Sequence, residues 1–145
     1  MSETRSLGRI KAPAKINLCL HITGQRPDGY HLLDSLVSLV GVGDELEMAI
    51  EPSLDADRIE IDGATIDGPA QDNLALKAVA ACRQWMTKQG TALPYVSARL
   101  QKVLPVASGL GGGSSDAVAA IKLIVRWAAE AGHPISLEQD GGVAL

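Results

Sequence analysis

The sequence predicts an α+β domain in which helices cover a mostly antiparallel sheet. Apolar and polar residues alternate in several segments of the first half of the chain, which is typical of strands. Two later segments instead repeat apolar residues at helical spacing. Because the strands come first and do not alternate regularly with helices, a parallel α/β sheet is disfavoured. The length of 145 residues suits a single domain.

The first strand is predicted from a long period-two pattern. Every even position from 10 to 22 is apolar, and polar residues such as Lys15, Asn17 and His21 lie between them. We therefore expect one face of this strand in the core, and the other face in solvent or in a functional site. Pro13 donates no backbone hydrogen bond, so it should interrupt the strand or lie at a sheet edge.

Further strands are predicted before the first helix. Residues 24–29 have the composition of a turn, and residues 30–40 form a strand-like segment rich in Leu and Val. Residues 41–44 predict a second turn. Residues 45–50 and 58–62 alternate cleanly, which indicates an antiparallel meander with one face in water.

Two helices and one more strand are predicted in the second half of the chain. Asn73, or the residue before it, suits a helix N-cap, and Gly90 suits the end of that helix. Residues 95–103 alternate as a strand. A second helix is predicted to begin at Ser114 and to end near Gly132.

The composition argues against several classes of function. Thirteen Lys and Arg against seventeen Asp and Glu give a net charge of −4 with no basic run, whereas nucleic-acid binding needs cations that neutralise phosphates. No apolar run approaches the ~18–20 residues of a membrane span. The two cysteines make no disulfide framework. We therefore expect a cytoplasmic enzyme or binding domain, with neither nucleic acid nor membrane as partner.

The most informative segment is the glycine-rich loop of residues 105–115, Pro-Val-Ala-Ser-Gly-Leu-Gly-Gly-Gly-Ser-Ser. Its four glycines let a ligand approach main-chain N–H groups closely. A helix follows at once, and a helix N-terminus attracts phosphate through about half a positive charge and its unpaired N–H donors. No lysine follows as in a Walker A loop, and Ser114 stands where a dinucleotide fingerprint needs glycine. We interpret the loop as a phosphate cradle, with a flexible linker as the alternative.

This loop resembles the ATP-binding loop of the GHMP small-molecule kinases. The segments Ala12-Pro-Ala-Lys-Ile-Asn-Leu18 and Thr23-Gly-Gln-Arg-Pro-Asp-Gly-Tyr-His31 are similar to further motifs of the same family. The resemblance covers nearly the whole chain, from Ile10 to about Leu137. It implies the fold of a GHMP kinase N-terminal domain, which is similar to domain 2 of ribosomal protein S5.

The resemblance implies roles for residues that match the N-terminal motifs. Lys15 would be catalytic, beside the acceptor hydroxyl and the transferring phosphoryl group, because phosphoryl transfer depends on positioning and charge neutralisation. Its alternative interpretation is an exposed strand lysine. Asn17 would bind the substrate, and Tyr30 and His31 would bind its cytosine ring. The alternative for the last two is ordinary packing on a neighbouring strand.

The resemblance also implies a set of ATP-binding residues. They are Asn73, Lys102, Pro105, Val106, Ala107, Ser108, Gly109, Leu110, Gly111, Gly112, Gly113, Ser114 and Ser115. Lys102 would lie beside the adenine end of the nucleotide, and its alternative is a solvated strand end. Asn73 would lie near the nucleotide or serve only as a helix cap. The backbone from Ser108 to Ser115 would hold the β- and γ-phosphates.

The implied reaction transfers the γ-phosphate of ATP, with Mg²⁺, to the 2-hydroxyl of 4-diphosphocytidyl-2-C-methyl-D-erythritol. This cytidylyl methylerythritol belongs to the non-mevalonate pathway of isoprenoid biosynthesis. The resemblance does not identify the magnesium ligands. Two alternatives stay open: a non-catalytic nucleotide-binding module of the same fold, and a GHMP kinase that acts on a different alcohol. An RNA-binding role, suggested by the ribosomal fold, is disfavoured by the acidic balance.

The sequence departs from the family pattern at its end. The family's general base is an aspartate in a Gly-Ala-Asp-x-Pro motif, and residues 141–145 end where that motif would be about to begin. Asp116 and Asp140 do not match this base by position. We therefore expect residues 1–145 to be the N-terminal ATP-binding domain of a longer kinase, without the C-terminal GHMP domain. We expect this chain to turn over very slowly and to self-associate through an uncovered apolar face.

Overall fold

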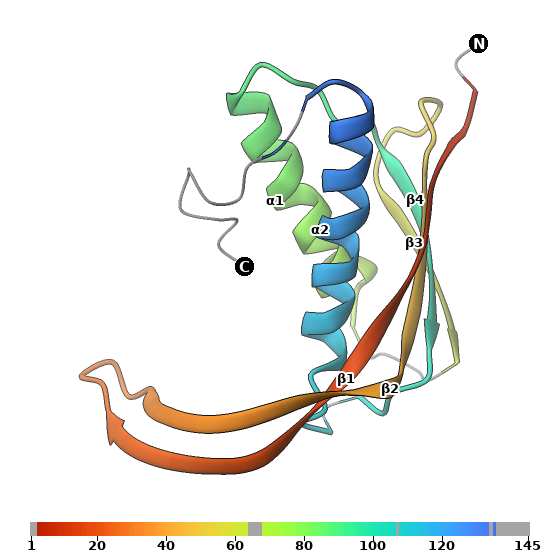
Figure 1. Ribbon diagram of the computed structural model, residues 1–145. Coiled ribbons are helices and arrows are strands. Elements are labelled where there is room, and N and C mark those ends of the chain that lie inside the picture. Colours follow the sequence, from red (N-terminus) through yellow and green to blue (C-terminus); the bar gives the residue numbers. More distant parts are fainter. Residues whose placement is uncertain (1–2, 64–67, 107, 134, 136–145) are drawn as a thin grey trace.

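The computed structural model describes residues 3–63, 68–106, 108–133 and 135 of the chain. Within these residues, two helices cover one face of a four-stranded sheet, and a long hairpin extends away from them (Figure 1). The elements, in chain order, are β1 (Arg5–Gln25), β2 (His31–Ile50), β3 (Arg58–Gly63), a 3-10 helix (Ala70–Asp72), α1 (Leu74–Lys88), β4 (Val96–Lys102) and α2 (Gly112–Glu130). The predicted α+β class is confirmed.

The strands are arranged in the order β1-β2-β4-β3. β1 pairs with β2 and β2 with β4 in antiparallel orientation, whereas β3 runs parallel to β4. The sheet is mostly antiparallel, as predicted, but the predicted meander from β2 to β3 is wrong because β4 lies between them. Charge favours this order, since Glu47 faces Arg99 and Arg99 faces Glu60. Like charges placed directly opposite each other, as two glutamates would be, destabilise a sheet.

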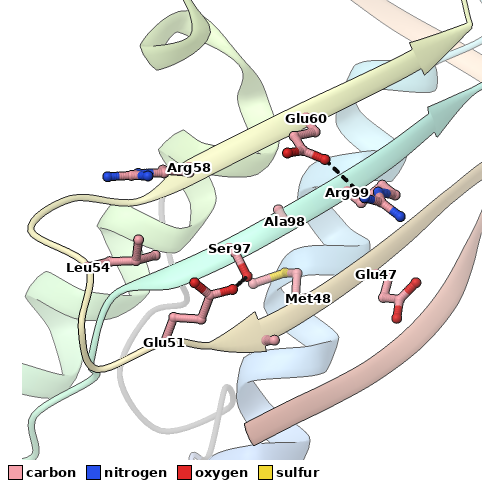
Figure 2. A pocket seen from close by; sticks show the side chains of 10 residues that line it. Glu47, Met48, Glu51, Leu54, Arg58, Glu60, Ser97, Ala98 and Arg99 are labelled. Atoms are coloured by element: carbon pink, nitrogen blue, oxygen red, sulfur yellow. Dashed lines mark hydrogen bonds and ion pairs between the residues drawn. The ribbon is translucent and has the colours of Figure 1, made fainter. Parts of the chain in front are cut away.

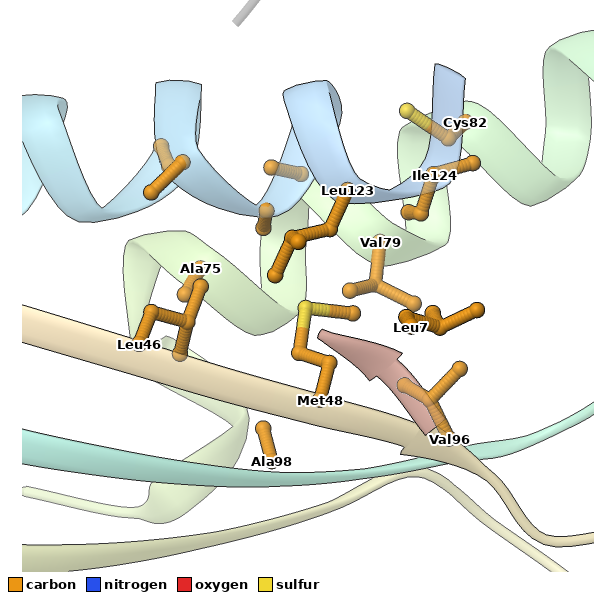
Figure 3. Close-up of a cluster of buried hydrophobic side chains, with 14 of the residues drawn as sticks. Leu7, Leu46, Met48, Ala75, Val79, Cys82, Val96, Ala98, Leu123 and Ile124 are labelled. Atoms are coloured by element: carbon orange, nitrogen blue, oxygen red, sulfur yellow. The ribbon is translucent and has the colours of Figure 1, made fainter. Parts of the chain in front are cut away.

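The core lies between the inner face of the sheet and the two helices (Figure 3). The even positions of residues 44–50 in β2 are buried, and the odd positions between them are partly exposed. Leu46 and Met48 on this inner face belong to the same buried cluster as Leu123 and Ile124 of α2. Burying one such side chain contributes about 1.5–3 kcal/mol. This apolar layer fixes α2, and with it the loop that precedes α2, against the sheet.

Beyond the core, β1 and β2 continue as a curved hairpin arm, residues 15–39, that extends away from the helices (Figure 1). Leu18 is 60% exposed and Ile22 is 65% exposed. The prediction that the apolar face of β1 lies in the core therefore holds for residues 10–14 and is wrong for residues 16–22. The reason is that neither α1 nor α2 reaches over this part of the hairpin.

The predicted turn at residues 41–44 is also wrong, because β2 passes through these positions without a break. The register of β1 against β2 shifts there, between the Pro13–Gly43 pair and the Lys15–Leu39 pair. A β-bulge absorbs extra residues of this kind and increases the local twist, so no turn is needed. Pro13 lies in an edge strand, as predicted.

Both helices begin at residues with a clear structural role. Asn73 is the predicted N-cap of α1, since its side chain accepts a hydrogen bond of 2.9 Å from the N–H of Ala75. α1 ends before Gly90, whose φ of +77° suits glycine. α2 begins at Gly112, earlier than the predicted Ser114, so part of the glycine-rich segment is helical. Neither described helix is long and apolar enough to cross a membrane.

Replacing Gly43 with alanine is expected to destabilise the fold by at least about 2 kcal/mol. An added Cβ would lie 2.6 Å from Cα of Pro13 and 2.8 Å from the carbonyl carbon of Ala12. Both atoms belong to the backbone of β1, so the two strands would have to separate. Urea unfolding followed by circular dichroism measures the loss. Gly41→Ala is the matched control, because an added Cβ there has nothing within 4 Å. Equal stabilities of the two variants would contradict this account.

Candidate functional site

The glycine-rich loop lies between β4 and α2, at the end of the sheet where the hairpin arm begins (Figure 1). Gly109 and Gly111 have φ values of +74° and +72°, in the left-handed region that glycine enters at little cost. The carbonyl of Leu110 accepts a hydrogen bond of 2.8 Å from the main-chain N–H of Lys15. The loop is therefore a defined turn attached to β1, and not the flexible linker of the alternative interpretation.

The N-terminus of α2 has no side-chain cap, in contrast to that of α1. Its N-cap residue is Gly111, whose carbonyl accepts the first intrahelical hydrogen bond from Ser115, at 2.9 Å. The N–H groups of residues 112–114 precede that bond and so have no partner within the helix. Free N–H groups together with the positive end of the helix dipole form an anion-binding site.

A cavity of about 310 Å³ opens over this helix start. It is lined by Asp72, Asn73, Leu74, Lys102, Pro105, Val106, Ser108, Gly109, Leu110, Gly111, Gly112, Gly113, Ser114 and Asp116. We call it the loop cavity. It brings together the sequence-predicted ATP-binding residues with two exceptions. Ser115 lies on the other side of the helix start, and Ala107 lies outside the described residues.

A second cavity, of about 410 Å³, lies on the other side of the start of α2. We call it the Lys15 cavity. Lys15 lines it together with Ile10, Lys11, Pro13, Leu39, Gly111, Ser114, Ser115, Val118, Ala119 and Lys122. Gly111 and Ser114 line both cavities, so the two cavities share a wall. A Cβ built on Gly111 would lie 3.5 Å from Cε of Lys15, which shows how closely the lysine stem follows the loop.

A buried ion cluster lies beneath the loop cavity. Nζ of Lys102 donates to Oδ2 of Asp44 at 2.5 Å and to Oδ2 of Asp116 at 2.8 Å. The other oxygen of Asp44 accepts from the main-chain N–H groups of Val103 and Leu104, at 2.6 and 2.7 Å. All three charged residues are buried: Asp44 is 0% exposed, Lys102 is 6% exposed and Asp116 is 2% exposed. The cluster therefore joins β2, β4 and α2 at the loop.

Burial and charge shift the pKa values of two members of this cluster. Burial raises the pKa of Asp116 to about 6, and the hydrogen bond and charge of Lys102 offset only part of this effect. Burial by itself lowers the pKa of Lys102, but the hydrogen bonds with Asp116 and Asp44 outweigh it, so that pKa is raised. The folded-state pKa of Asp116 lies above its ordinary value of 3.8. The contribution of Asp116 to stability therefore falls as the pH rises from about 4 to about 6.

The interpretation of Lys102 as a solvated strand end is wrong, because it is a buried member of the cluster. Asp44 and Asp116 were not predicted as site residues. The period-two pattern holds a signal for Lys102, which continues the buried series of Val96, Ala98 and Leu100 at even positions of β4. A lysine on the inner face of a strand requires a buried carboxylate partner.

The predicted substrate residues do not all meet at Lys15. The side-chain oxygen of Asn17 lies 3.4 Å from Nζ of Lys15, so these two residues share a face, as predicted. Tyr30 and His31 instead lie at the tip of the hairpin arm, and Tyr30 is 73% exposed. About ten residues of strand, or roughly 33 Å of extended chain, separate Lys15 from the residue that pairs with His31. No described cavity contains both Lys15 and Tyr30.

A third cavity, of about 330 Å³, lies on the open face of the sheet (Figure 2). Its polar side chains have partners on the protein: Arg99 pairs with Glu60 at 3.1 Å, and Ser97 donates to Glu51 at 2.5 Å. Across the whole sheet, this face carries alternating positive and negative side chains that are typical of a solvated surface. We assign no function to this cavity.

The chain is similar to known kinases in sequence. A family model described as "GHMP kinases N terminal domain" matches residues 73–140. The 4-diphosphocytidyl-2-C-methyl-D-erythritol kinase of Paramagnetospirillum magneticum is 48% identical over 120 residues, which cover 81% of this chain and 39% of the relative. The kinase of the same name from Ruegeria pomeroyi is 42% identical over 142 residues, which cover 92% of this chain and 46% of the relative. The chain spans less than half the length of these relatives.

The chain is also similar to solved structures. A crystal structure of 4-(cytidine 5'-diphospho)-2C-methyl-D-erythritol kinase matches with a TM-score of 0.61 and 30% identity, over 89% of this chain and 42% of that chain. A homoserine kinase from Cytophaga hutchinsonii matches with a TM-score of 0.59 at 16% identity, over 96% of this chain and 39% of that chain, and shares the fold. The predicted GHMP fold is confirmed. The chain belongs to the GHMP kinase family and has the fold of its N-terminal domain.

Proposed function

We propose that this chain takes part in the transfer of the γ-phosphate of ATP to the 2-hydroxyl of 4-diphosphocytidyl-2-C-methyl-D-erythritol, in non-mevalonate isoprenoid biosynthesis. One observation carries the proposal: the uncapped start of α2 separates the loop cavity from the Lys15 cavity by a shared wall, Gly111 and Ser114. A phosphate group bound at that wall is therefore close to an acceptor molecule bound in the Lys15 cavity. The names of the relatives support the choice of acceptor.

In this proposal, the loop cavity binds the triphosphate. The free N–H groups of residues 112–114 donate to oxygens of the β- and γ-phosphates, and Ser108 and Ser114 add hydroxyl groups. Ser115 adds its hydroxyl group from the adjoining Lys15 cavity. Pro105 and Val106 contact the nucleoside side, and Asn73 keeps its role as the cap of α1 while it lines the cavity. Preorganised donors of this kind stabilise charge that develops on phosphate oxygens.

Lys15 is the proposed catalytic residue. Its ammonium group would neutralise charge on the transferring phosphoryl group and favour ionisation of the acceptor hydroxyl. Its main chain is bound to the loop at Leu110, so the ammonium group and the phosphate site keep a fixed relation. Asn17, which lies against the Lys15 ammonium, would hold the acceptor. Lys102 supports the loop from beneath.

Tyr30 and His31 are proposed to bind the cytosine ring at the tip of the arm, by stacking and by hydrogen bonds. This assignment requires the arm to bend toward the cavities when the acceptor is bound.

The exposed apolar side chains of the arm, such as Leu18 and Ile22, also lead us to propose self-association. We further propose that the reaction takes place in the cytoplasm, where ATP is available.

ATP is expected to bring Mg²⁺ with it. The loop cavity suits the anion, because its donors are main-chain N–H groups and its walls are small residues. The described residues contain no group of three or more His, Cys, Asp or Glu that would hold a metal ion by themselves. Mg²⁺ is commonly bound by substrate phosphates, water and one or two carboxylates, and here it would supply charge neutralisation.

Replacing Gly111 with alanine is expected to weaken binding of a non-hydrolysable ATP analogue at least about tenfold. A side chain at φ +72° strains the turn by about 1–2 kcal/mol, and this turn forms the wall of the loop cavity. Isothermal titration calorimetry measures the affinity. The matched control is Gly132→Ala at the other end of α2, where φ is +83° and nothing lies within 4 Å of the added Cβ. Equal affinities of both variants would contradict a loop cavity that binds ATP.

Replacing Lys15 with methionine is expected to slow phosphoryl transfer about 10²–10³-fold, with affinity for the ATP analogue little changed. Methionine keeps the apolar stem and removes the charge. Transfer of ³²P from labelled ATP to the acceptor measures the rate, and Lys88→Met, at the end of α1, is the control. A chain that binds ATP but shows the same transfer with and without the Lys15 ammonium would favour the alternative of a non-catalytic nucleotide-binding module.

A further inference from the structure

Asp116 has a buried carboxylate oxygen with no hydrogen-bond partner. Oδ2 accepts from Lys102, whereas Oδ1 is fully buried and has no partner among the described residues. Buried polar atoms nearly always have a partner, so an exception needs an explanation. Asp116 also lines the loop cavity, beside the free N–H groups at the start of α2. The unpartnered oxygen therefore belongs to a residue in the wall of the cavity in which the proposed function puts a polyphosphate.

The loop cavity has charged groups of both signs around it, and not only groups that attract an anion. Asp44 and Asp116 carry two negative charges when ionised, and Lys102 supplies one positive charge, so the ion cluster is net negative. From the α1 side, Asp72 lines the cavity and is paired with Lys77 at 3.0 Å. From β1, Lys15 faces the other side of Gly111. A polyphosphate that enters the loop cavity is thus attracted by the helix start and repelled by the cluster beneath it.

Protonation of one carboxylate removes the net negative charge of the ion cluster, and with it the repulsion of the polyphosphate. The hydrogen bonds indicate which carboxylate takes up the proton. Asp44 uses both oxygens as acceptors, two main-chain N–H groups on Oδ1 and the Lys102 ammonium on Oδ2. A proton on Asp44 would displace one of these donors. Asp116 has a free oxygen, and protonation there breaks no existing bond. The negative charge beneath the cavity falls by one, and every bond that holds Lys102 and Asp44 is kept.

We propose that Asp116, at the wall of the loop cavity, takes up a proton from solvent when a polyphosphate binds there. The inference rests on the proposed function, because it requires an anion in this cavity. No covalent bond of the protein or the nucleotide breaks. The cluster becomes neutral, and its hydrogen bonds to Lys102 remain. Asp116 affects polyphosphate binding through its charge and takes no part in phosphoryl transfer.

The pKa of Asp116 is suited to this role. Burial places it at about 6 in the free protein, and a nearby anion raises it further because it opposes the ionised form. If the anion raises the pKa by about one unit, the protein takes up about 0.4 proton per nucleotide at pH 7. The same shift weakens binding about fivefold between pH 6 and pH 8. A fully ionised aspartate far from the anion would show neither effect.

Calorimetric titration of the whole chain with β,γ-methylene-ATP tests the inference. The titration is run at pH 7 in two buffers of different ionisation enthalpy, with EDTA present, so that the difference in heat counts protons. The wild type and Asp116→Asn are compared, because subtraction removes the titration of the nucleotide itself. The wild type is expected to take up about 0.4 proton more than the variant. Asp72→Asn is the matched control from the same cavity, and its proton count is expected to equal that of the wild type.

Equal proton counts for the wild type and Asp116→Asn, with nucleotide bound to both, would overturn the inference and leave the proposed function intact. Failure of the wild type to bind the nucleotide at all would overturn both. A second measurement needs no variant: the ¹³C resonance of the Asp116 carboxyl is followed against pH with and without nucleotide. Its midpoint is expected to move upward with nucleotide bound, and an unchanged or lowered midpoint would contradict the proposal.

Discussion

The site depends on one buried interaction, the bond between the Lys102 ammonium and the carboxylates of Asp44 and Asp116. These residues come from β4, β2 and α2, and the bond fixes these three elements to one another. Oδ1 of Asp44 also accepts hydrogen bonds from the N–H groups of Val103 and Leu104, which fixes the backbone direction where the chain leaves β4. A buried ion pair contributes little net stability, but loss of one partner is costly. The cluster therefore specifies where the glycine-rich loop begins and where α2 starts.

The loop is held from two sides, which explains how a segment so rich in glycine keeps a shape. The ion cluster supports it from beneath, and the main-chain bond between Lys15 and Leu110 holds it to β1. Gly112 lies so close to the cluster that an added Cβ would be 3.0 Å from Nζ of Lys102. Glycine thus leaves room at this position for the ammonium group and the Asp44 carboxylate. The result is an uncapped helix start whose donors face two adjoining cavities.

The periodic patterns predicted the elements better than their arrangement. Alternation at residues 45–50 and 95–103 correctly predicted strands, and the N-cap role of Asn73 followed from its residue type. The position of β4 between β2 and β3 was missed, because neighbouring segments in sequence were assumed to pair. The exposed arm was missed as well. A period-two pattern shows that a strand has an apolar face, but not what covers that face.

The same division holds for the site. Free N–H groups at a helix start after a glycine-rich loop follow from local sequence, and the loop prediction agrees with the geometry of Gly109 and Gly111. The ion cluster could not be predicted from local sequence, because it joins Asp44 and Lys102, which are 58 residues apart. The only local sign of the cluster is the position of Lys102 on the inner face of its strand. The location of Tyr30 and His31 depends on the curvature of a long hairpin, which no local pattern encodes.

The most direct test of the central claim is a crystal structure of this chain with β,γ-methylene-ATP. The account predicts phosphate oxygens within hydrogen-bond distance of the main-chain N–H groups of residues 112–114, with the bond between Lys15 and Leu110 unchanged. Electron density for the nucleotide at another place, or a loop folded over the helix start so that no anion fits, would contradict it.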